Sequence, residues 1–274
     1  MTLSLWVIIM CGLGLLAGSV VNCAIWRLPV MLQRQALTEA RQISGLPPGQ
    51  DEWPVRFNLF WPRSCCPRCR SPLAFYHNIP LLSWLLLRGR CHSCRHRISW
   101  RYPLVELSAA LCSGWIALCW PPGETAMALA LCTWLLIALI TLDLQHLLLP
   151  DLLTLPLLWL GLLVNLKGAL VPLSDAVVGA ATGYLTLWLI YWGFKLATGK
   201  EGLGYGDFKL LAALGAWCGW QRLPSLLLYA ALMGMAAVLI LRLTGRSQQG
   251  DPLPFGPCLA LSGWWLLNTP SMTE

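Results

Sequence analysis

Two aspartates in this chain could do chemistry that an apolar sequence rarely supports. Asp143 and Asp207 lie 64 positions apart (207 − 143), and each stands at the edge of a long apolar run. An ionised carboxylate is costly in such a place unless it has a partner or a task. When two carboxyl groups share one proton, the ionised group can activate water while the protonated group polarises a scissile carbonyl. The pair therefore predicts an aspartyl hydrolase, with a plain interfacial acid at Asp143 as the alternative.

Glycines stand directly before the second aspartate, at Gly204 and Gly206. A residue without a Cβ atom lets another backbone come close. We therefore expect these glycines to give a peptide substrate access to the Asp207 carboxylate.

A second group of residues suited to chemistry is a pair of C-x-x-C motifs in one polar loop, with 21 residues between them. Its members are Cys66, Cys69, Cys91 and Cys94. This spacing is slightly longer than the usual zinc spacing of about 15–20 residues, and it is compatible with a tetrahedral all-thiolate site. In a reducing cytoplasm, metal binding is favoured over a disulfide. We predict a structural zinc site with no open position for catalysis, and Cys65, His92 and His96 remain alternative ligands.

The composition indicates the elements that must position these groups. Of the 274 residues, 57% are hydrophobic and 11% are charged, against roughly 25% charged residues in an ordinary soluble domain. Eight apolar segments are expected to be helices that cross a lipid bilayer, at 3–26, 104–120, 125–142, 152–166, 176–196, 208–220, 225–241 and 255–268. The sequence thus predicts an all-α polytopic membrane protein with about eight transmembrane helices and a cytoplasmic zinc-binding loop domain between helices 1 and 2.

The distribution of basic residues predicts the orientation in the membrane. The polar region after the first segment holds 12 of the 19 Lys and Arg residues, which is typical of a cytoplasmic loop. A nucleic-acid surface is disfavoured, because the loop is tethered to a membrane and lacks a recognition-module pattern. If all eight segments cross, seventeen Lys and Arg residues lie inside against two outside, and both aspartates lie on the inner side. We divide the chain into a first transmembrane helix (1–26), a basic cytoplasmic loop with the cysteine pairs (27–103) and a transmembrane peptidase core (104–274).

Short motifs spread along the chain carry a family resemblance. They are GSVVN at 18–22, RLP at 27–29, the cysteine pairs, NIPLLSW at 78–84, RGRC at 88–91, ISWRYPLVE at 98–106, DLQHLLLPD at 143–151, GYGDFK at 204–209 and PFGP at 254–257. With these motifs the chain resembles, over nearly its whole length, the bacterial type IV prepilin peptidases, which are leader peptidases and N-methyltransferases of type IV pilus and type II secretion systems.

The resemblance implies roles for the residues already singled out. Asp143 and Asp207 would be the catalytic aspartates, and the four cysteines of the C-x-x-C motifs would bind zinc. The substrates would be prepilins and pseudopilins, whose basic leader is removed after a glycine at the cytoplasmic face of the bacterial inner membrane. The new N-terminal residue would then be methylated with S-adenosylmethionine. No glycine-rich nucleotide loop follows a predicted strand, so the cofactor-binding residues are not assigned. The cysteine loop and Glu106 are the candidates, and Glu106 as an interfacial acid is the alternative.

Two other function classes are compatible with the residues alone. The first is a membrane transporter that uses the acids as a carboxylate proton relay, although these acids lie at one interface and not at mid-membrane. The second is a non-enzymatic assembly subunit of a secretion machine that docks through its cysteine loop. We also expect Asp151, next to Pro150, to cap a helix, and we hypothesise that Asp151 and Glu201 attract a basic leader.

Overall fold

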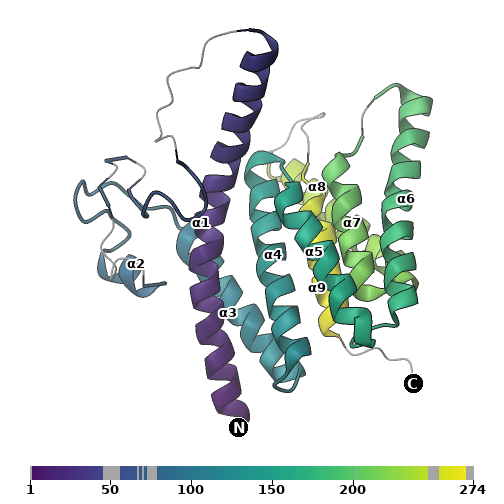
Figure 1. Cartoon of the computed structure of the whole chain (residues 1–274), viewed down its shortest axis with the longest axis horizontal. Coiled ribbons are helices and arrows are strands. Elements are labelled where there is room, and N and C mark those ends of the chain that lie inside the picture. The colour runs from purple at the N-terminus through teal and green to yellow at the C-terminus, as the bar shows by residue number, and fades with distance from the viewer. Residues whose placement is uncertain are drawn as a thin grey trace. The chain divides into compact units, whose positions relative to one another are not determined.

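The computed structural model describes residues 2–45, 56–66, 68–69, 71–72, 79–200, 202–245 and 253–269. Over these ranges the protein is helical, and its extended pairing is limited to two isolated β-bridges, Cys65 to Pro72 and Arg90 to Arg97 (Figure 1). The chain divides into two compact units, Met1–Leu118 and Cys119–Glu274. The all-helical prediction is confirmed.

The first unit contains the helices α1 (Leu3–Ile43), α2 (Leu82–Leu86) and α3 (Arg101–Cys119). Small residues let α1 and α3 approach backbone to backbone. A Cβ atom on Gly14 would lie 2.5 Å from the Ala109 carbonyl oxygen, and one on Gly18 would lie 2.7 Å from Glu106 Cα. Such contacts are typical of helix pairs in membranes. They bring the middle of α1 next to the N-terminal part of α3.

Helix α1 is longer than the predicted first span, which ended at residue 26. The helix continues to Ile43 and includes Pro29. The apolar run ends near residue 26, but good helix-forming residues follow it, so the helix does not end with the run. Arg27, the first residue after this run, is buried, and its guanidinium donates to the carbonyl oxygens of Asn58 (2.8 Å) and Pro62 (2.5 Å).

The second unit is a bundle of six helices with two short 3₁₀ turns. The helices are α4 (Glu124–His146), α5 (Asp151–Val164), α6 (Leu173–Thr198), α7 (Tyr205–Cys218), α8 (Leu223–Leu243) and α9 (Gly256–Asn268), and the turns are η2 (Asn165–Lys167) and η3 (Trp220–Arg222). The core of this unit is α7, which packs against α5, α6 and α9 (Figure 1). Asp207, Phe208 and all residues from Leu210 to Cys218 are buried.

Close backbone contacts and buried hydrogen bonds hold α7 in place. A Cβ atom on Gly215 would lie 2.2 Å from the Gly179 carbonyl oxygen, so α6 and α7 touch at two glycines. On another side, the indole N–H of Trp217 donates to the Leu157 carbonyl of α5 (2.8 Å), and the Asn165 amide donates to the Ala216 carbonyl (3.0 Å). The start of α7, which carries Asp207, is therefore fixed by the packing of the whole helix.

Five helices of the described chain are long and apolar enough to cross a membrane. They are Leu3–Ile43, Arg101–Cys119, Glu124–His146, Leu173–Thr198 and Trp220–Leu243. The other three predicted segments are helical, but α5, α7 and α9 have 13 or 14 residues. Such helices are about 20 Å long, against a hydrocarbon layer of about 30 Å. A helical protein with several membrane spans is thus confirmed, whereas the count of eight spans is not.

Candidate active site and metal centre

Asp143 lies in the last turn of α4 and is 5% exposed. The backbone N–H of Gly256, the first residue of α9, donates to Asp143 Oδ2 at 3.1 Å. The first N–H groups of a helix lack partners within the helix and carry its positive dipole end, so they suit a carboxylate. A Cβ atom on residue 256 would lie 2.6 Å from the same oxygen, so this contact requires glycine. Sequence reasoning missed the role of Gly256, because the two residues are 113 positions apart.

Asp207 lies in the first turn of α7 and is 7% exposed. Its backbone N–H donates to the Gly204 carbonyl at 3.2 Å. Its carboxyl group is close enough to that of Asp143 for the two charges to repel each other. The ends of α4 and α7 thus bring the two aspartates into one buried site. Two carboxylates in such a site cannot both ionise without a large cost, which is the condition for sharing a proton.

Of the two glycines before Asp207, Gly206 serves the packing of the chain itself. A Cβ atom on Gly206 would lie 2.6 Å from Leu149 Cβ, so the space that we expected for a peptide substrate is filled by Leu149. A Cβ atom on Gly204 would lie 3.6 Å from Asp207 Oδ2, which is ordinary contact. Leu149 also approaches Gly256, since a Cβ atom there would lie 3.2 Å from Leu149 Cδ1. The connection between α4 and α5 therefore packs against the starts of both α7 and α9.

Asp151 does not cap α5. Pro150 occupies the cap position without a side-chain cap bond, and Asp151 is the first helical residue. Its carboxylate forms an ion pair with Lys209 of α7, with Nζ and Oδ1 2.5 Å apart. Both side chains are partly exposed, so the pair lies at the surface of the unit. Glu201, which we grouped with Asp151 in attracting a basic leader, lies outside the described residues.

The four predicted zinc ligands come together in the first unit. The sulfur atoms of Cys66, Cys69, Cys91 and Cys94 all lie within 4.8 Å of one another. Cys66 Sγ and Cys94 Sγ are 3.8 Å apart, and a tetrahedral site with Zn–S bonds of about 2.3 Å separates its sulfur atoms by about 3.8 Å. Two similar turns hold the cluster, because the N–H of Cys66 donates to the Ser71 carbonyl (3.0 Å) and the N–H of Cys91 to the His96 carbonyl (2.9 Å).

Two thiols of the cluster have a lowered pKa, which favours the thiolate, the form that binds zinc, whereas desolvation and hydrogen bonds with the neighbouring thiols raise the pKa of the Cys94 thiol to about 11. A hydrogen bond from the Ser71 hydroxyl lowers the pKa of the Cys69 thiol to about 6. The backbone N–H of Cys94 lowers the pKa of the Cys91 thiol. All twelve cysteines lie in the described ranges, and none of them forms a disulfide. The donor set therefore fits zinc.

The alternative ligands lie outside this cluster. Among the His, Cys, Asp and Glu residues that the structure describes, the group within ligand distance contains neither Cys65, His92 nor His96. His96 Nδ1 instead lies 3.2 Å from Arg68 Nη1. Glu106 is buried, and its Oε2 accepts a hydrogen bond from the backbone N–H of Leu81 at 2.9 Å.

Comparison with known proteins divides the chain in a similar way. Residues 13–120 match the profile described as the bacterial peptidase A24 N-terminal domain, and residues 129–239 match that of the type IV leader peptidase family. A prepilin leader peptidase/N-methyltransferase of Aeromonas salmonicida is 56% identical over 251 residues, which cover 92% of this chain and 86% of the relative. Proteins of the same name from two other bacteria are also similar to the chain. The one from Dickeya chrysanthemi is 52% identical over 258 residues (94% and 90% covered), and the one from Pseudomonas aeruginosa is 51% identical over 255 residues (92% and 86% covered). No solved structure matches the chain.

Proposed function

The chain belongs to the type IV leader peptidase family, and from this premise we propose that it is a prepilin leader peptidase and N-methyltransferase. It removes the basic leader of prepilins and pseudopilins and then methylates the new N-terminal residue. The observation that carries the peptidase half is the buried pair of Asp143 and Asp207, which lies within the stretch that matches the family.

In the proposed cleavage, the two aspartates share one proton. The ionised carboxylate takes a proton from water while its protonated partner donates a hydrogen bond to the scissile carbonyl. The water oxygen bonds to the carbonyl carbon, the C–N bond breaks, and the leaving amine takes up a proton. The Gly256 N–H orients Asp143 by holding one of its oxygens. Because the pair titrates as a unit, the base is the pair and not one assigned residue.

The second proposed reaction uses S-adenosylmethionine. When bound, this cofactor would supply an electrophilic methyl group for transfer to the free amine, with the C–S electron pair staying on sulfur and the amine giving up a proton. The amine becomes available only after the leader has been removed, so cleavage must come first.

For the membrane arrangement, we propose that α5, α7 and α9 also cross, which gives eight spans. Short helices can lie across a bilayer when other helices surround them, and α7 is buried in this way. Asp143 at the end of α4 and Asp207 at the start of α7 then lie at the cytoplasmic face of the bacterial inner membrane. The excess of seventeen Lys and Arg residues on the inner side against two on the outer side supports this orientation.

We further propose that the four clustered cysteines bind one structural zinc ion. Zinc would cross-link the two turns that carry the C-x-x-C motifs. A site with four protein ligands leaves no position for a substrate, so its role is to fold the loop.

The test of the peptidase assignment is cleavage of a purified prepilin in detergent by wild type, Asp143→Asn and Asp207→Asn. We expect both variants to fold and to lose at least about 10³-fold in cleavage rate. Asp175→Asn is the matched control. Asp175 lies in the first turn of α6, as Asp207 does in α7, but its carboxylate accepts a hydrogen bond from the Gln221 side chain at 2.8 Å and is not part of the aspartate pair. Cleavage within tenfold of wild type by either variant would remove that aspartate from the mechanism and make Asp151 the next candidate.

The same assay separates the other function classes. A transporter or an assembly subunit would leave the prepilin at its full length. A mass increase of one methyl group in place of one hydrogen on the wild-type product would establish the second activity.

A further inference from the structure

The short helix α2 leaves its leucine side chains exposed. None of its residues is buried, and Leu82, Leu85 and Leu86 are 56–77% exposed. Residues three and four positions apart lie on one face of a helix, so these leucines form one apolar face. A contiguous exposed apolar patch marks a surface that binds another protein or a membrane. The α2 face therefore calls for a partner.

The chain that follows α2 lines a basic cavity of about 430 Å³. Three arginines, Arg88, Arg90 and Arg95, contribute to its wall, and none of its lining residues that the structure describes is an acid. Leu86 belongs both to this wall and to the apolar face of α2, so the two features adjoin. Guanidinium groups form paired hydrogen bonds with phosphate oxygens. The cavity thus suits a phosphate group next to an apolar chain.

Backbone contacts fix the arginine-bearing turns against α2. The Gly89 N–H donates to the Trp84 carbonyl at 2.8 Å, and a Cβ atom on Gly89 would lie 2.8 Å from the Trp84 ring. The Ile98 N–H donates to the Gly89 carbonyl at 2.8 Å. On the other side of the cavity, the Arg95 N–H donates to the Cys91 carbonyl at 3.0 Å. The apolar face and the arginines therefore belong to one folded element.

Contacts with α3 give the depth of this element relative to the lipid. Helix α3 is long and apolar enough to cross a membrane and begins at Arg101. Trp84 of α2 packs on Trp100, with ring centroids 4.2 Å apart, and the Leu81 N–H donates to Glu106 of α3 at 2.9 Å. Tryptophan is enriched where spans meet the headgroups, and Trp100 is 68% exposed. Helix α2 is thus tied to the end of a candidate span.

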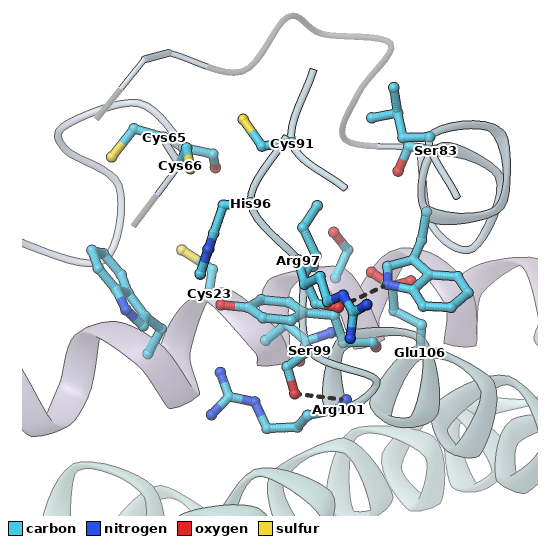
Figure 2. Close-up of a pocket in the computed structure, with 18 of the residues that line it drawn as sticks. Cys23, Cys65, Cys66, Ser83, Cys91, His96, Arg97, Ser99, Arg101 and Glu106 are labelled. Carbon is cyan, nitrogen blue, oxygen red and sulfur yellow. Dashed lines mark hydrogen bonds between the residues drawn. The ribbon is translucent and has the colours of Figure 1, made fainter. Parts of the chain in front are cut away.

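The end of the apolar run of α1 lies at the same level. The Asn22 amide donates to the carbonyl of Tyr102, in the first turn of α3, at 2.9 Å. Arg27, the first charged residue of the chain, follows little more than one helical turn later. Figure 2 shows Ser83 of α2 on the same side of the view as Glu106 of α3. Two candidate spans therefore agree that α2 lies at the lipid boundary.

We propose that α2 and the arginine cavity dock on the membrane surface and bind an anionic phospholipid. The three leucines enter the boundary between headgroups and acyl chains, and the arginines bind the lipid phosphate. Amphipathic elements bind membranes through these two contributions, buried apolar area and attraction of basic groups to anionic lipids. The docking holds the cysteine loop against the lipid. The proposal goes beyond the two proposed reactions and depends on neither of them.

The first test is titration of the full-length, zinc-loaded protein in a non-ionic detergent with phosphatidylglycerol and, separately, with phosphatidylcholine. Each basic residue at an anionic lipid surface contributes about fivefold in affinity. We therefore expect the double variant Arg88→Gln, Arg95→Gln to bind phosphatidylglycerol about 25-fold more weakly, with no change for phosphatidylcholine. The matched control, Arg41→Gln with Arg56→Gln, removes the same charge from the same unit, and neither residue lines the cavity. Equal affinity in the two double variants would overturn the proposal.

Two further measurements separate the lipid from other occupants of the cavity. The cavity is also lined by Cys91, and a zinc ion held by four thiolates carries a net negative charge that arginines offset. Zinc content should stay at that of wild type in Arg88→Gln with Arg95→Gln, and its loss would assign these arginines to the metal. Inorganic phosphate should not compete with the lipid. Competition at equal concentration would show a site for a free anion and contradict the proposal.

Photochemical cross-linking locates the apolar face. Leu86→p-benzoylphenylalanine should cross-link to phospholipid in nanodiscs made of phosphatidylglycerol. The matched position is Ile43, an apolar residue at the end of α1 that is 88% exposed, and Ile43→p-benzoylphenylalanine should give little lipid adduct. A lipid yield at Leu86 no higher than at Ile43 would overturn the proposal. Cross-links from Leu86 only to residues 119–274, or to an added prepilin, would show that protein covers this face and would also overturn it.

Discussion

The two units hold their polar groups by different means. In Cys119–Glu274, helix ends place Asp143 and Asp207, and the close packing of α7 fixes the second of them. In Met1–Leu118, turns closed by backbone hydrogen bonds hold four clustered thiols. Helix packing is stable without a ligand, whereas turns of this kind would depend on the proposed zinc ion for their fold. The comparison implies that the two proposed reactions should fail under different perturbations.

The largest expected effect is that of removing the proposed zinc ion. Removing zinc with a chelator, or replacing Cys91 by Ser, should open the cysteine turns, since zinc binding contributes about 10–16 kcal/mol to the folding of such sites. We expect S-adenosylmethionine affinity to fall at least about 100-fold, while prepilin cleavage falls far less. Metal content, limited proteolysis and the two activity assays measure this.

The control for this experiment is Cys119→Ser, which changes an exposed cysteine outside the cluster. It should leave zinc content and both activities at wild-type values. Equal losses of cleavage and cofactor binding on zinc removal would contradict the division between the two units.

The next effect concerns the helix end that holds Asp143. Gly256→Ala places a Cβ atom 2.6 Å from Asp143 Oδ2, so the carboxylate must move. We expect cleavage to fall about 100-fold, as for other small displacements of catalytic groups, with no change in cofactor affinity. Gly234→Ala is the control, because a Cβ atom there meets nothing closer than 3.9 Å. Cleavage by Gly256→Ala within threefold of wild type would show that the N–H contact does not position the acid.

A smaller effect is expected at Arg27, which ties the segment around Asn58 to α1. Arg27→Met removes two charge-assisted hydrogen bonds and leaves two carbonyl groups without their donor. We expect the free energy of local opening to fall by about 2–3 kcal/mol, measured by amide hydrogen exchange at residues 56–61. Arg41→Met, in the last turn of the same helix, should not change it. Unchanged exchange in Arg27→Met would mean that other contacts hold the segment.

The smallest effect is expected for the ion pair of Asp151 and Lys209. Partly exposed pairs contribute about 0.2–1 kcal/mol. A double-mutant cycle with Asp151→Asn and Lys209→Gln, read by thermal unfolding, should give a coupling energy in this range. A coupling above about 2 kcal/mol would make the pair an anchor between α5 and α7, comparable to the buried contacts of the core.

The spacing of the cysteines, and the cost of placing a charge beside an apolar run, were enough to predict the cysteine cluster and the aspartate pair from the sequence. Two C-x-x-C motifs in one loop can reach one metal ion whatever the rest of the fold, and the four sulfur atoms do meet. Acids at the ends of apolar runs must find partners, and Asp143 and Asp207 share one buried site. Their catalytic role remains a prediction, as does the identity of the metal.

Contacts between distant segments could not be predicted in this way. The Gly256 N–H reaches Asp143 across 113 positions, and Gly206 packs on Leu149, because helix packing and not local sequence brings them together. Asp151 was a reasonable cap from its neighbours, yet Pro150 takes that position and Lys209 binds the acid. Hydropathy marked the end of an apolar run near residue 26 but not the end of α1.

The length of α1 sets how far the helix extends beyond the lipid layer. Its 41 residues span about 61 Å, twice the thickness of a hydrocarbon layer of about 30 Å. The stretch from Ser19 to Arg27 lies about 24–36 Å along the helix from Leu3. If the hydrocarbon layer begins at Leu3, this stretch lies at the opposite boundary of the layer. Adding or deleting residues before Ser19 would therefore change the depth of this stretch in the membrane.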